Sequence, residues 1–330
     1  MKKLRVGING FGRIGRTLFR VLHYRKGIEV VAINDVADIR SMAHLLKYDS
    51  IHRIFAPKIT YSKSMLCVDG REVYFSHEKK IQNISWNDCD FVVEATGFFL
   101  SISDLRLHIN SGARKVILAS PPSSEDIKMI VLGVNNHLLS SNDIIVSNAS
   151  CTTNSAAPMV QLIDDSFGVE QAYITTIHSY TKDQSLHDSP HRDLRRARAG
   201  AMSIIPTTTG AAKALSKIFP HLEIGGCGIR VPVPNGSLTD ITFTVKTPCS
   251  IKKVNELFFT ASNGSHSGII GYTDEPIVSS DVLGNPVSCL FDSQLTSVLG
   301  KMIKIVSWYD NEMGYSNRLA DLIEKMSHED

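Results

Sequence analysis

One stretch near the N-terminus decides the fold of this chain: residues 4–15, LRVGINGFGRIG. A short apolar run reads as a strand, and the glycine-rich turn after it leads into residues 13–25, whose apolar side chains recur at helical spacing. Asp35 closely follows the next apolar run, 28–33, at a position where a carboxylate can accept hydrogen bonds from the hydroxyls of a ribose. The stretch therefore predicts a dinucleotide-binding unit in which Gly10, Gly12 and Gly15 permit the tight turn and a close approach to pyrophosphate. The Asp35 carboxylate would repel a 2′-phosphate, which favours NAD over NADP.

Length and composition exclude several classes of protein. The 330 residues suggest about two domains, and 43% hydrophobic with 21% charged residues is an ordinary globular balance. A net charge of +2 gives little general attraction to nucleic acid or to an acidic membrane. The longest uncharged stretch, 144–163, carries too many polar side chains for a membrane span. We expect a cytoplasmic protein without membrane segments and with free thiols.

The order of patterns predicts an α/β fold with two different halves. Up to residue 150, apolar runs alternate with helical patterns, which is typical of a doubly wound parallel Rossmann sheet. Asp69-Gly70 predicts a hairpin within it. Residues 151–312 predict an α+β domain, in which a helix to about 165 precedes a mostly antiparallel sheet. The expected strands are 4–8, 28–33, 91–95, 115–119, 130–134, 144–146, 173–178, 241–245 and 304–308; the other expected helices are 38–47 and 101–112.

One of the six cysteines stands in an unusual place. In the block 147–154, SNASCTTN, Cys151 lies where a strand and a polar turn lead into a helix. Unpaired backbone N–H groups and the helix dipole stabilise negative charge there, which predicts a lowered thiol pKa and a nucleophile. The alternative is a buried structural cysteine, but hydroxyl side chains surround this one. His178, at the end of a predicted strand, is the candidate base.

Two basic segments predict anion sites. One is the run 193–198, DLRRAR, and the other contains Arg230; the hydroxyl-rich segment 207–210, TTTG, lies between them. Arginine, threonine and backbone N–H groups are the usual ligands of phosphate. The basic run could also touch RNA, but no aromatic stacking platform accompanies it. His187 and His191 have the spacing of half a zinc site without a third ligand, so we expect no metal.

The blocks INGFGRIGR at 8–16, IND at 33–35 and SNASCTTN at 147–154, together with four others, resemble the phosphorylating glyceraldehyde-3-phosphate dehydrogenase family, of bacterial type. The further blocks are HLLKYDS at 44–50, TTIH at 175–178, IIPTTTGAAK at 204–213 and WYDNE at 308–312. The resemblance covers essentially the whole chain. It implies a Rossmann domain, 1–150, completed by a C-terminal helix at about 313–330, a catalytic domain, 151–312, and a homotetramer.

The resemblance also implies a reaction. Cys151 would attack glyceraldehyde 3-phosphate, and His178 would take the thiol proton and then assist hydride transfer to NAD. Inorganic phosphate would cleave the resulting thioester to 1,3-bisphosphoglycerate. Thr181 and Arg230 resemble the site for the phosphate of the substrate. Ser150, Thr152, Thr209 and Gly210 resemble the site for the attacking phosphate. Arg195 is the best match for the loop arginine of that site, although Arg196 and Arg198 leave that choice open. The implied cofactor contacts are Gly10, Gly12, Arg13, Ile14, Asp35, Thr96 and Asn311.

Some positions depart from the family pattern. Ser189-Pro190 stands where NAD-using relatives tend to carry Leu-Pro and NADP-tolerant relatives carry smaller polar residues, so NADP stays open as a second cofactor. Two other functions also stay open. One is the sister activity on erythrose 4-phosphate, and the other is an added RNA-binding or scaffold role suggested by the run 195–198.

Overall fold

The computed structural model describes residues 3–329, which divide into two compact units. Unit 1 takes in the described residues up to Ile130, His137–Ala149 and those from Ser316 onward; unit 2 takes in Val131–Asn136 and Ser150–Tyr315. The short segment 131–136 belongs to unit 2, where His266 Nε2 lies 3.2 Å from the Gly133 carbonyl oxygen. In the described part of the chain, no helix is both long and apolar enough to cross a membrane.

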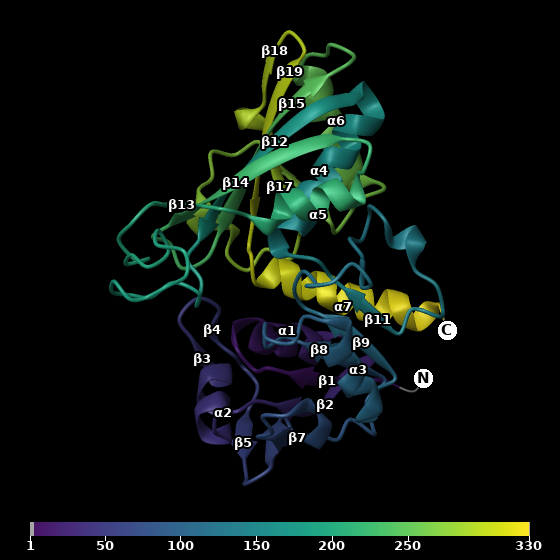
Figure 1. Cartoon of the computed structure of the whole chain (residues 1–330), viewed down its shortest axis with the longest axis vertical. Coiled ribbons are helices and arrows are strands. Elements are labelled where there is room, and N and C mark those ends of the chain that lie inside the picture. The colour runs from purple at the N-terminus through teal and green to yellow at the C-terminus, as the bar shows by residue number, and fades with distance from the viewer. Residues whose placement is uncertain (1–2, 330) are drawn as a thin grey trace. The chain divides into compact units, whose positions relative to one another are not determined.

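Unit 1 is built on a nine-stranded sheet in the order β10-β11-β9-β8-β1-β2-β7-β6-β5 (Figure 1). Neighbours from β10 to β7 run parallel, and β6 and β5 continue the sheet antiparallel at one edge. The strands are β1 (Leu4–Asn9), β2 (Ile28–Asn34), β5 (Ile59–Tyr61), β6 (Met65–Val68), β7 (Arg71–Ser76), β8 (Phe91–Glu94), β9 (Lys115–Leu118), β10 (Lys128–Met129) and β11 (Ile145–Ser147). A separate two-stranded ladder pairs β3 (Tyr48–Asp49) with β4 (Arg53–Ile54).

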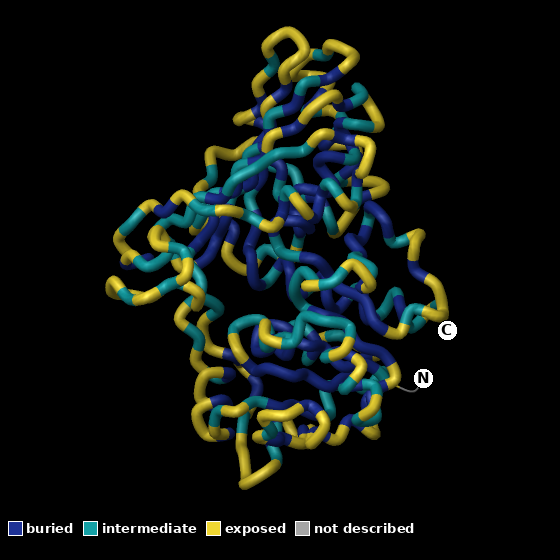
Figure 2. Tube along the Cα trace, in the orientation of Figure 1, coloured by how far each residue is buried: buried dark blue, intermediate teal, exposed yellow. Residues whose placement is uncertain are grey.

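The predicted parallel sheet and its hairpin are confirmed. All four residues of β8 and of β9 are buried, as expected of central strands covered on both faces, and Figure 2 shows such strands in dark blue. Asp69 and Gly70 both have positive φ, 49° and 78°, which is the geometry of the tight turn predicted from their sequence. The strand predicted at 130–134 is wrong: the pairing residues are Lys128 and Met129, and the apolar run after them forms buried turns.

Two helices of unit 1, α2 and α3, begin close to the predicted positions because local side chains cap them, whereas α1 begins at the predicted Arg13 without a side-chain cap. Ser101 and Asp104 form a capping box at the start of α3, and Asp38 accepts from Ser41 N at the start of α2. From Ser316 onward the C-terminal helix packs on unit 1, where Arg25 lies 2.8 Å from Asp321. The helices are α1 (Arg13–Tyr24), α2 (Ile39–Lys47), α3 (Ile102–Asn110) and α7 (Met313–His328), with 3₁₀ turns η1 (Ile81–Asn83) and η2 (Asn136–Leu138).

Unit 2 contains an eight-stranded, mostly antiparallel sheet in the order β13-β14-β12-β15-β19-β17-β16, with β18 also pairing β19. Only β12 with β14 and β16 with β17 run parallel. Burial alternates along β15, as in a sheet packed on one face. The strands are β12 (Val169–Ser179), β13 (Ile205–Thr207), β14 (Glu223–Val231), β15 (Ser237–Val245), β16 (Ile270–Thr273), β17 (Cys289–Asp292), β18 (Ser297–Leu299) and β19 (Met302–Tyr309).

Three helices pack on this sheet. In Figure 1, α4 and α5 lie against β12, β14 and β15. Helix α6 packs on β16. The segment 180–204 between β12 and β13 has neither helix nor strand, so it forms a long loop. The helices are α4 (Cys151–Phe167), α5 (Gly210–Ile218) and α6 (Ile251–Asn263), with 3₁₀ turns η3 (Ser279–Val282) and η4 (Ser293–Leu295).

Two glycines of the first turn should respond differently to alanine. A Cβ on Gly15 would lie 2.1 Å from the Gly10 carbonyl oxygen, whereas a Cβ on Gly12 would meet nothing within 4 Å. Overpacking of this kind costs about 1–3 kcal/mol, and each kcal/mol lowers the melting temperature by about 2–4 °C in a protein of this size. We expect Gly15→Ala to lower the melting temperature by several degrees and Gly12→Ala to leave it nearly unchanged in calorimetry. Equal melting temperatures for the two variants would contradict this packing.

Candidate active site

The predicted nucleophile and base meet in unit 2. Cys151 is the first residue of α4, His178 is the last but one of β12, and Cys151 Sγ lies 3.5 Å from His178 Nε2. The parallel ladder of β12 with β14 pairs His178 with Arg230, so both side chains come from neighbouring positions of the sheet. Three residues far apart in the sequence are therefore brought together by one helix start and two paired strands.

Hydrogen bonds fix the orientation of the imidazole. His178 Nδ1 lies 2.7 Å from the Ser179 carbonyl oxygen, which can only accept, so we assign the proton to Nδ1. Arg230 Nη1 donates to the same carbonyl at 2.9 Å; it also lies 2.7 Å from Nδ1, but two N–H donors cannot bond each other, so in this tautomer Arg230 bonds only the carbonyl. In this tautomer Nε2 carries the lone pair and faces Cys151 Sγ. The site thus holds a base directed at the thiol.

Burial shifts both members of the pair toward their neutral forms. Burial, with Arg230 as the next cause, lowers the pKa of His178 to about 3. Burial also raises the pKa of the Cys151 thiol, although Arg230 and the Thr152 and Cys151 backbone groups act in the opposite direction. The lowered thiol pKa expected from the helix start is therefore wrong in direction, because burial outweighs the effects of Arg230 and of the neighbouring hydrogen bonds. The resting pair is a thiol and a neutral imidazole.

The start of α4 is held by its own capping side chain. Ser150 Oγ accepts from Thr153 N at 3.0 Å and lies 2.7 Å from Thr153 Oγ1. The residue before it, Ala149, has φ 54°, a left-handed conformation that costs a non-glycine residue free energy and is common beside active sites. The turn therefore places the first N–H groups of the helix around Cys151.

Tyr309 joins the site and was not singled out from the sequence. Its hydroxyl lies 2.9 Å from Thr152 Oγ1 and 3.0 Å from Thr176 Oγ1, and its ring stands edge-on to His178 at 6.1 Å between ring centres. Burial raises the pKa of Tyr309 above its usual range, so the phenol stays protonated. Because Tyr309 lies in the WYDNE block, that block was the signal for it.

The residues expected at the anion sites all lie in unit 2, and of these Arg230 lies directly beside His178. Arg230 is mostly buried, and burial lowers its pKa. The Thr181 hydroxyl makes no hydrogen bond with any described residue, although its backbone N bonds Gln184 Oε1 at 3.3 Å. Thr209 caps α5 by accepting from Ala211 N, and a Cβ on Gly210 would meet nothing within 4 Å. The start of α5 is therefore open to an anion.

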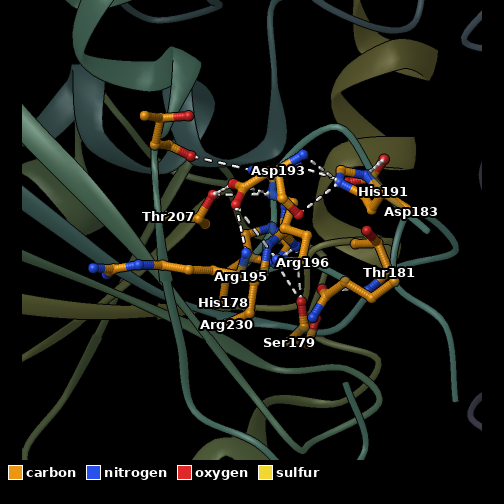
Figure 3. Close-up of polar contacts among 12 residues, drawn as sticks. His178, Ser179, Thr181, Asp183, His191, Asp193, Arg195, Arg196, Thr207 and Arg230 are labelled. Atoms are coloured by element: carbon orange, nitrogen blue, oxygen red, sulfur yellow. Dashed lines mark hydrogen bonds and ion pairs between the residues drawn. The ribbon is translucent and has the colours of Figure 1, made fainter. Parts of the chain in front are cut away.

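The structure distinguishes the three loop arginines. Arg196 bonds Asp183, Thr207 and Thr208, and Arg198 pairs with Asp188 at 2.9 Å. Arg195 is exposed, its side chain has no partner among the described residues, and in Figure 3 it extends away from the cluster. Arg195 is thus the arginine available to a ligand. Because its neighbours are paired with acids, the run is not a continuous basic surface.

Asn311 is oriented by two serine hydroxyls. Ser179 Oγ and Ser237 Oγ each donate to Asn311 Oδ1 at 2.9 Å. With Oδ1 occupied, the amide nitrogen is the part of the side chain that can meet a ligand. Asn311 follows Asp310, which accepts from the backbone N of Glu312 and Met313 at the start of α7.

Unit 1 carries the residues expected to bind a dinucleotide. No side chain caps the start of α1 at Gly12, where there is room for a ligand. Asp35 accepts from Phe11 N at 2.6 Å and from Ala37 N at 2.9 Å, one bond to each oxygen, which leaves lone pairs for a ribose. The Arg13 side chain pairs with Asp49, so Arg13 and its neighbour Ile14 would offer backbone N–H groups.

Thr96 is held by a buried glutamate that the sequence did not single out. Glu94 Oε1 accepts from Thr96 N at 2.8 Å and also from its hydroxyl, while Glu94 Oε2 lies 3.0 Å from His108 Nε2. Trp86 Nε1 donates to His108 Nδ1 at 3.0 Å, so Nε2 carries the proton and donates to Glu94. The Thr96 hydroxyl is therefore used within the protein, and a ligand would meet the backbone of this turn.

Comparisons with known proteins agree with this geometry. Two family models match, the NAD binding domain of glyceraldehyde 3-phosphate dehydrogenase at residues 4–102 and its C-terminal domain at residues 150–311. The chain belongs to the glyceraldehyde-3-phosphate dehydrogenase family. Its two domains are the oxidoreductase domains of that family, with NAD as the cofactor of the first.

Relatives that carry the family name align over nearly the whole chain. The glyceraldehyde-3-phosphate dehydrogenase of Thermotoga maritima is 49% identical over 97% of this chain and 98% of its own length. Glyceraldehyde-3-phosphate dehydrogenase 2 of Streptomyces avermitilis is 48% identical over 97% of both chains. The enzyme of Priestia megaterium is 46% identical, again over 97% of both. The predicted resemblance and fold class are confirmed.

The pairing of Cys151 with His178 should increase the reactivity of the Cys151 thiol, which can be measured. His178→Asn removes the base that accepts the Cys151 proton, and general bases contribute about 10²–10⁴-fold. We expect alkylation of Cys151 by iodoacetamide at pH 7 to slow by about that factor and to keep rising with pH above 9, because the unassisted thiol has a raised pKa. Mass spectrometry of the Cys151 peptide measures the rate. The exposed His187→Asn is the control; equal rates in the two variants would contradict the assignment.

Proposed function

We propose that this chain oxidises glyceraldehyde 3-phosphate to 1,3-bisphosphoglycerate, with inorganic phosphate as the second substrate and NAD as the hydride acceptor. The observation that carries the proposal is that Cys151 Sγ lies 3.5 Å from His178 Nε2, the ring nitrogen that carries the lone pair. A thiol beside a base suits acyl transfer, because sulfur attacks a carbonyl readily and also leaves readily. The same residues serve both halves of the reaction.

The first half forms a covalent bond on Cys151. As Sγ attacks the aldehyde carbon, the thiol proton passes to His178 Nε2 and the carbonyl oxygen becomes an alkoxide. The N–H groups at the start of α4 stabilise that oxygen. The imidazolium then protonates the alkoxide, giving a thiohemiacetal and restoring the neutral base. Arg230 and Thr181 hold the phosphate of the substrate and so fix the aldehyde carbon beside Sγ.

The second half oxidises and releases the acyl group. NAD, when bound, supplies the acceptor for the hydride that leaves the thiohemiacetal carbon. His178 takes the hydroxyl proton in the same step, and a thioester remains on Cys151. An oxygen of inorganic phosphate attacks the thioester carbon, the C–S bond breaks, and the leaving sulfur takes its proton back from His178. Ser150, Thr152, Thr209, Gly210 and Arg195 are the proposed ligands of the attacking phosphate.

The residues of unit 1 fit NAD. The open space at Gly12, the uncapped start of α1 and the spare lone pairs of Asp35 suit pyrophosphate and a ribose without 2′-phosphate. In unit 2, Asn311 presents its amide nitrogen to the nicotinamide carboxamide in this proposal. Gly10, Arg13, Ile14 and the Thr96 turn complete the proposed contacts with backbone groups.

A homotetramer and a cytoplasmic location remain predictions. Exposed apolar side chains on the loop 180–204 support assembly, since such a group on one segment is typical of a subunit interface. These are Leu186, Leu194, Met202 and Ile204, between 70% and 82% exposed.

Steady-state kinetics test the proposed function. With glyceraldehyde 3-phosphate, we expect NADH to form continuously only when NAD and inorganic phosphate are both present, and Cys151→Ser to abolish turnover while NAD still binds. Retained turnover in that variant would contradict the nucleophile. Erythrose 4-phosphate should give a lower kcat/KM, and a higher one would favour the sister activity. An NADP rate equal to the NAD rate would mean that Asp35 does not select the cofactor.

A further inference from the structure

A buried row of hydrogen-bonded side chains crosses the carboxyl end of the parallel sheet in unit 1, and the reaction itself does not use it. Four residues form this row, each the last of its strand: Glu94 of β8, Asn9 of β1, Asn34 of β2 and Ser76 of β7. The four strands are neighbours in the sheet (Figure 1), and the ladders pair the four residues side by side. Each is at most 9% exposed. We call them the strand-end row.

Glu94 accepts hydrogen bonds at one end of the strand-end row. Its Oε2 accepts from Asn9 Nδ2 at 2.5 Å and lies 3.0 Å from His108 Nε2. Because Trp86 Nε1 donates to His108 Nδ1, the ring proton lies on Nε2 and points at Glu94. Glu94 Oε1 accepts from Thr96 N at 2.8 Å. Both carboxyl oxygens therefore face N–H donors.

This acceptor determines how the Asn9 amide lies. Asn9 must turn Nδ2 toward Glu94, so its Oδ1 faces the next strand, where it accepts from Asn34 Nδ2 at 2.9 Å. An Asn9 amide turned over would place its Oδ1 against Glu94 Oε2, two acceptors without a hydrogen atom between them. One carboxyl group thus sets the direction of the hydrogen bond between the next two strands.

The backbone at the other end of the row requires the same direction. Asn34 Oδ1 accepts from Ser76 Oγ and from Glu78 N, each at 2.8 Å, and Asn34 Nδ2 also donates to the Glu78 carbonyl oxygen at 2.9 Å. A backbone N–H can only donate and a carbonyl oxygen can only accept, so Glu78 fixes the Asn34 amide independently. Asn9 is therefore held between an acceptor, Glu94, and a donor, Asn34, neither of which can turn.

The turns that follow the strand-end row carry three of the expected cofactor residues, Gly10, Asp35 and Thr96. Asp35 directly follows Asn34, and its backbone N donates to the Ser76 carbonyl oxygen at 3.1 Å. A Cβ on Gly10 would lie 2.7 Å from Thr96 N, so these two turns are in contact. Ligands of such sheets bind at the carboxyl ends of the strands. The row lies directly behind the turns expected to meet the dinucleotide.

We propose that Glu94 is a positioning residue for the cofactor: it holds the Thr96 turn directly and fixes the turns after β1 and β2 through the two asparagine amides. The inference rests on the proposed cofactor contacts and deepens them. Glu94 does not itself touch NAD in this account, because both of its oxygens are used within the protein. A fully satisfied buried network holds one geometry, whereas one mismatched member leaves polar groups unpaired.

Titration calorimetry of Glu94→Gln with NAD tests the inference. The substitution keeps the shape of the side chain but turns an NH₂ group toward either Asn9 and His108 or Thr96 N, so donors oppose donors. In metal sites, residues that orient the ligating groups contribute about 10–100-fold to affinity, and we expect the Kd for NAD to rise about tenfold. KM for NAD should rise with it while kcat changes less than about twofold, the pattern of lost ground-state binding. Alkylation of Cys151 by iodoacetamide should be unchanged.

Leu105→Ala is the control for stability. Leu105 is fully buried in α3 and belongs to the core of unit 1, so its truncation should lower the melting temperature and leave the Kd for NAD unchanged. A lower melting temperature with an unchanged Kd in Glu94→Gln as well would show a purely structural role and overturn the proposal.

Exchanging the two side-chain types tests the direction of the row. Asn9→Asp alone places two carboxyl groups side by side and should also raise the Kd for NAD, so it tests the row even if Glu94→Gln does not fold. In the double variant the new amide at position 94 donates to the new carboxylate at position 9, which still accepts from Asn34 Nδ2. We expect the double variant to bind NAD more tightly than either single variant, but less tightly than the wild type, because His108 loses its acceptor. Losses that simply add in the double variant would overturn the assigned direction.

A parallel variant separates this inference from the proposed function. Asp35→Ala removes a proposed ribose ligand and should raise the Kd for NAD. If it does while Glu94→Gln binds NAD as the wild type does, the positioning role alone fails. If neither variant raises the Kd, the proposed cofactor contacts fail and the positioning role fails with them.

Discussion

The bond between His178 Nδ1 and the Ser179 carbonyl oxygen is the constraint on which the active site depends. It places the proton on Nδ1 and leaves Nε2 as the base facing Cys151 Sγ. The β12–β14 ladder supports it, because its register puts Arg230 opposite His178 and lets Arg230 donate to the same carbonyl. A shift of one residue would turn both side chains to the other face of the sheet. The chemistry at the end of β12 is therefore fixed by strand pairing.

Burial favours the neutral forms of the ionisable groups at this site. Burial alone disfavours the ionised forms of Cys151, His178 and Arg230, and each has its pKa shifted accordingly. In the proposed function, a phosphate group bound by Arg230 would supply the missing negative charge and relieve the cost of the buried guanidinium. The neutral thiol–imidazole pair keeps its proton until a carbonyl is present to accept the electron pair of sulfur. The arrangement favours proton transfer in step with attack over a thiolate maintained at rest.

The sequence predicts features that depend on local chemistry. The glycine turn, Asp35, the Asp69-Gly70 hairpin and the start of α4 at Cys151 were all placed from neighbouring residues. The strand at 130–134 was misplaced because an apolar run does not reveal whether its backbone pairs or turns. The direction of the Cys151 pKa was wrong because desolvation depends on residues distant in the sequence. The contacts of Tyr309 and Glu94 could not be predicted from the sequence, since both act through hydrogen bonds to segments that only folding brings close.

The sequence also could not show which of the loop arginines is free to bind a ligand. Arg195, Arg196 and Arg198 are equivalent as a pattern, and only the positions of Asp183 and Asp188 show which of them is already paired. Two paired arginines beside one unpaired arginine hold the shape of the loop and leave one cation exposed.

Rapid mixing without inorganic phosphate tests the central claim, that Cys151 and His178 together form the acyl-enzyme. Enzyme mixed with NAD and saturating glyceraldehyde 3-phosphate should release a burst of one NADH per chain, and mass spectrometry should find the acyl group on Cys151. In His178→Asn the burst should keep its amplitude and slow by about 10²–10⁴-fold. An acyl group on another residue, or an equally fast burst in His178→Asn, would contradict the account.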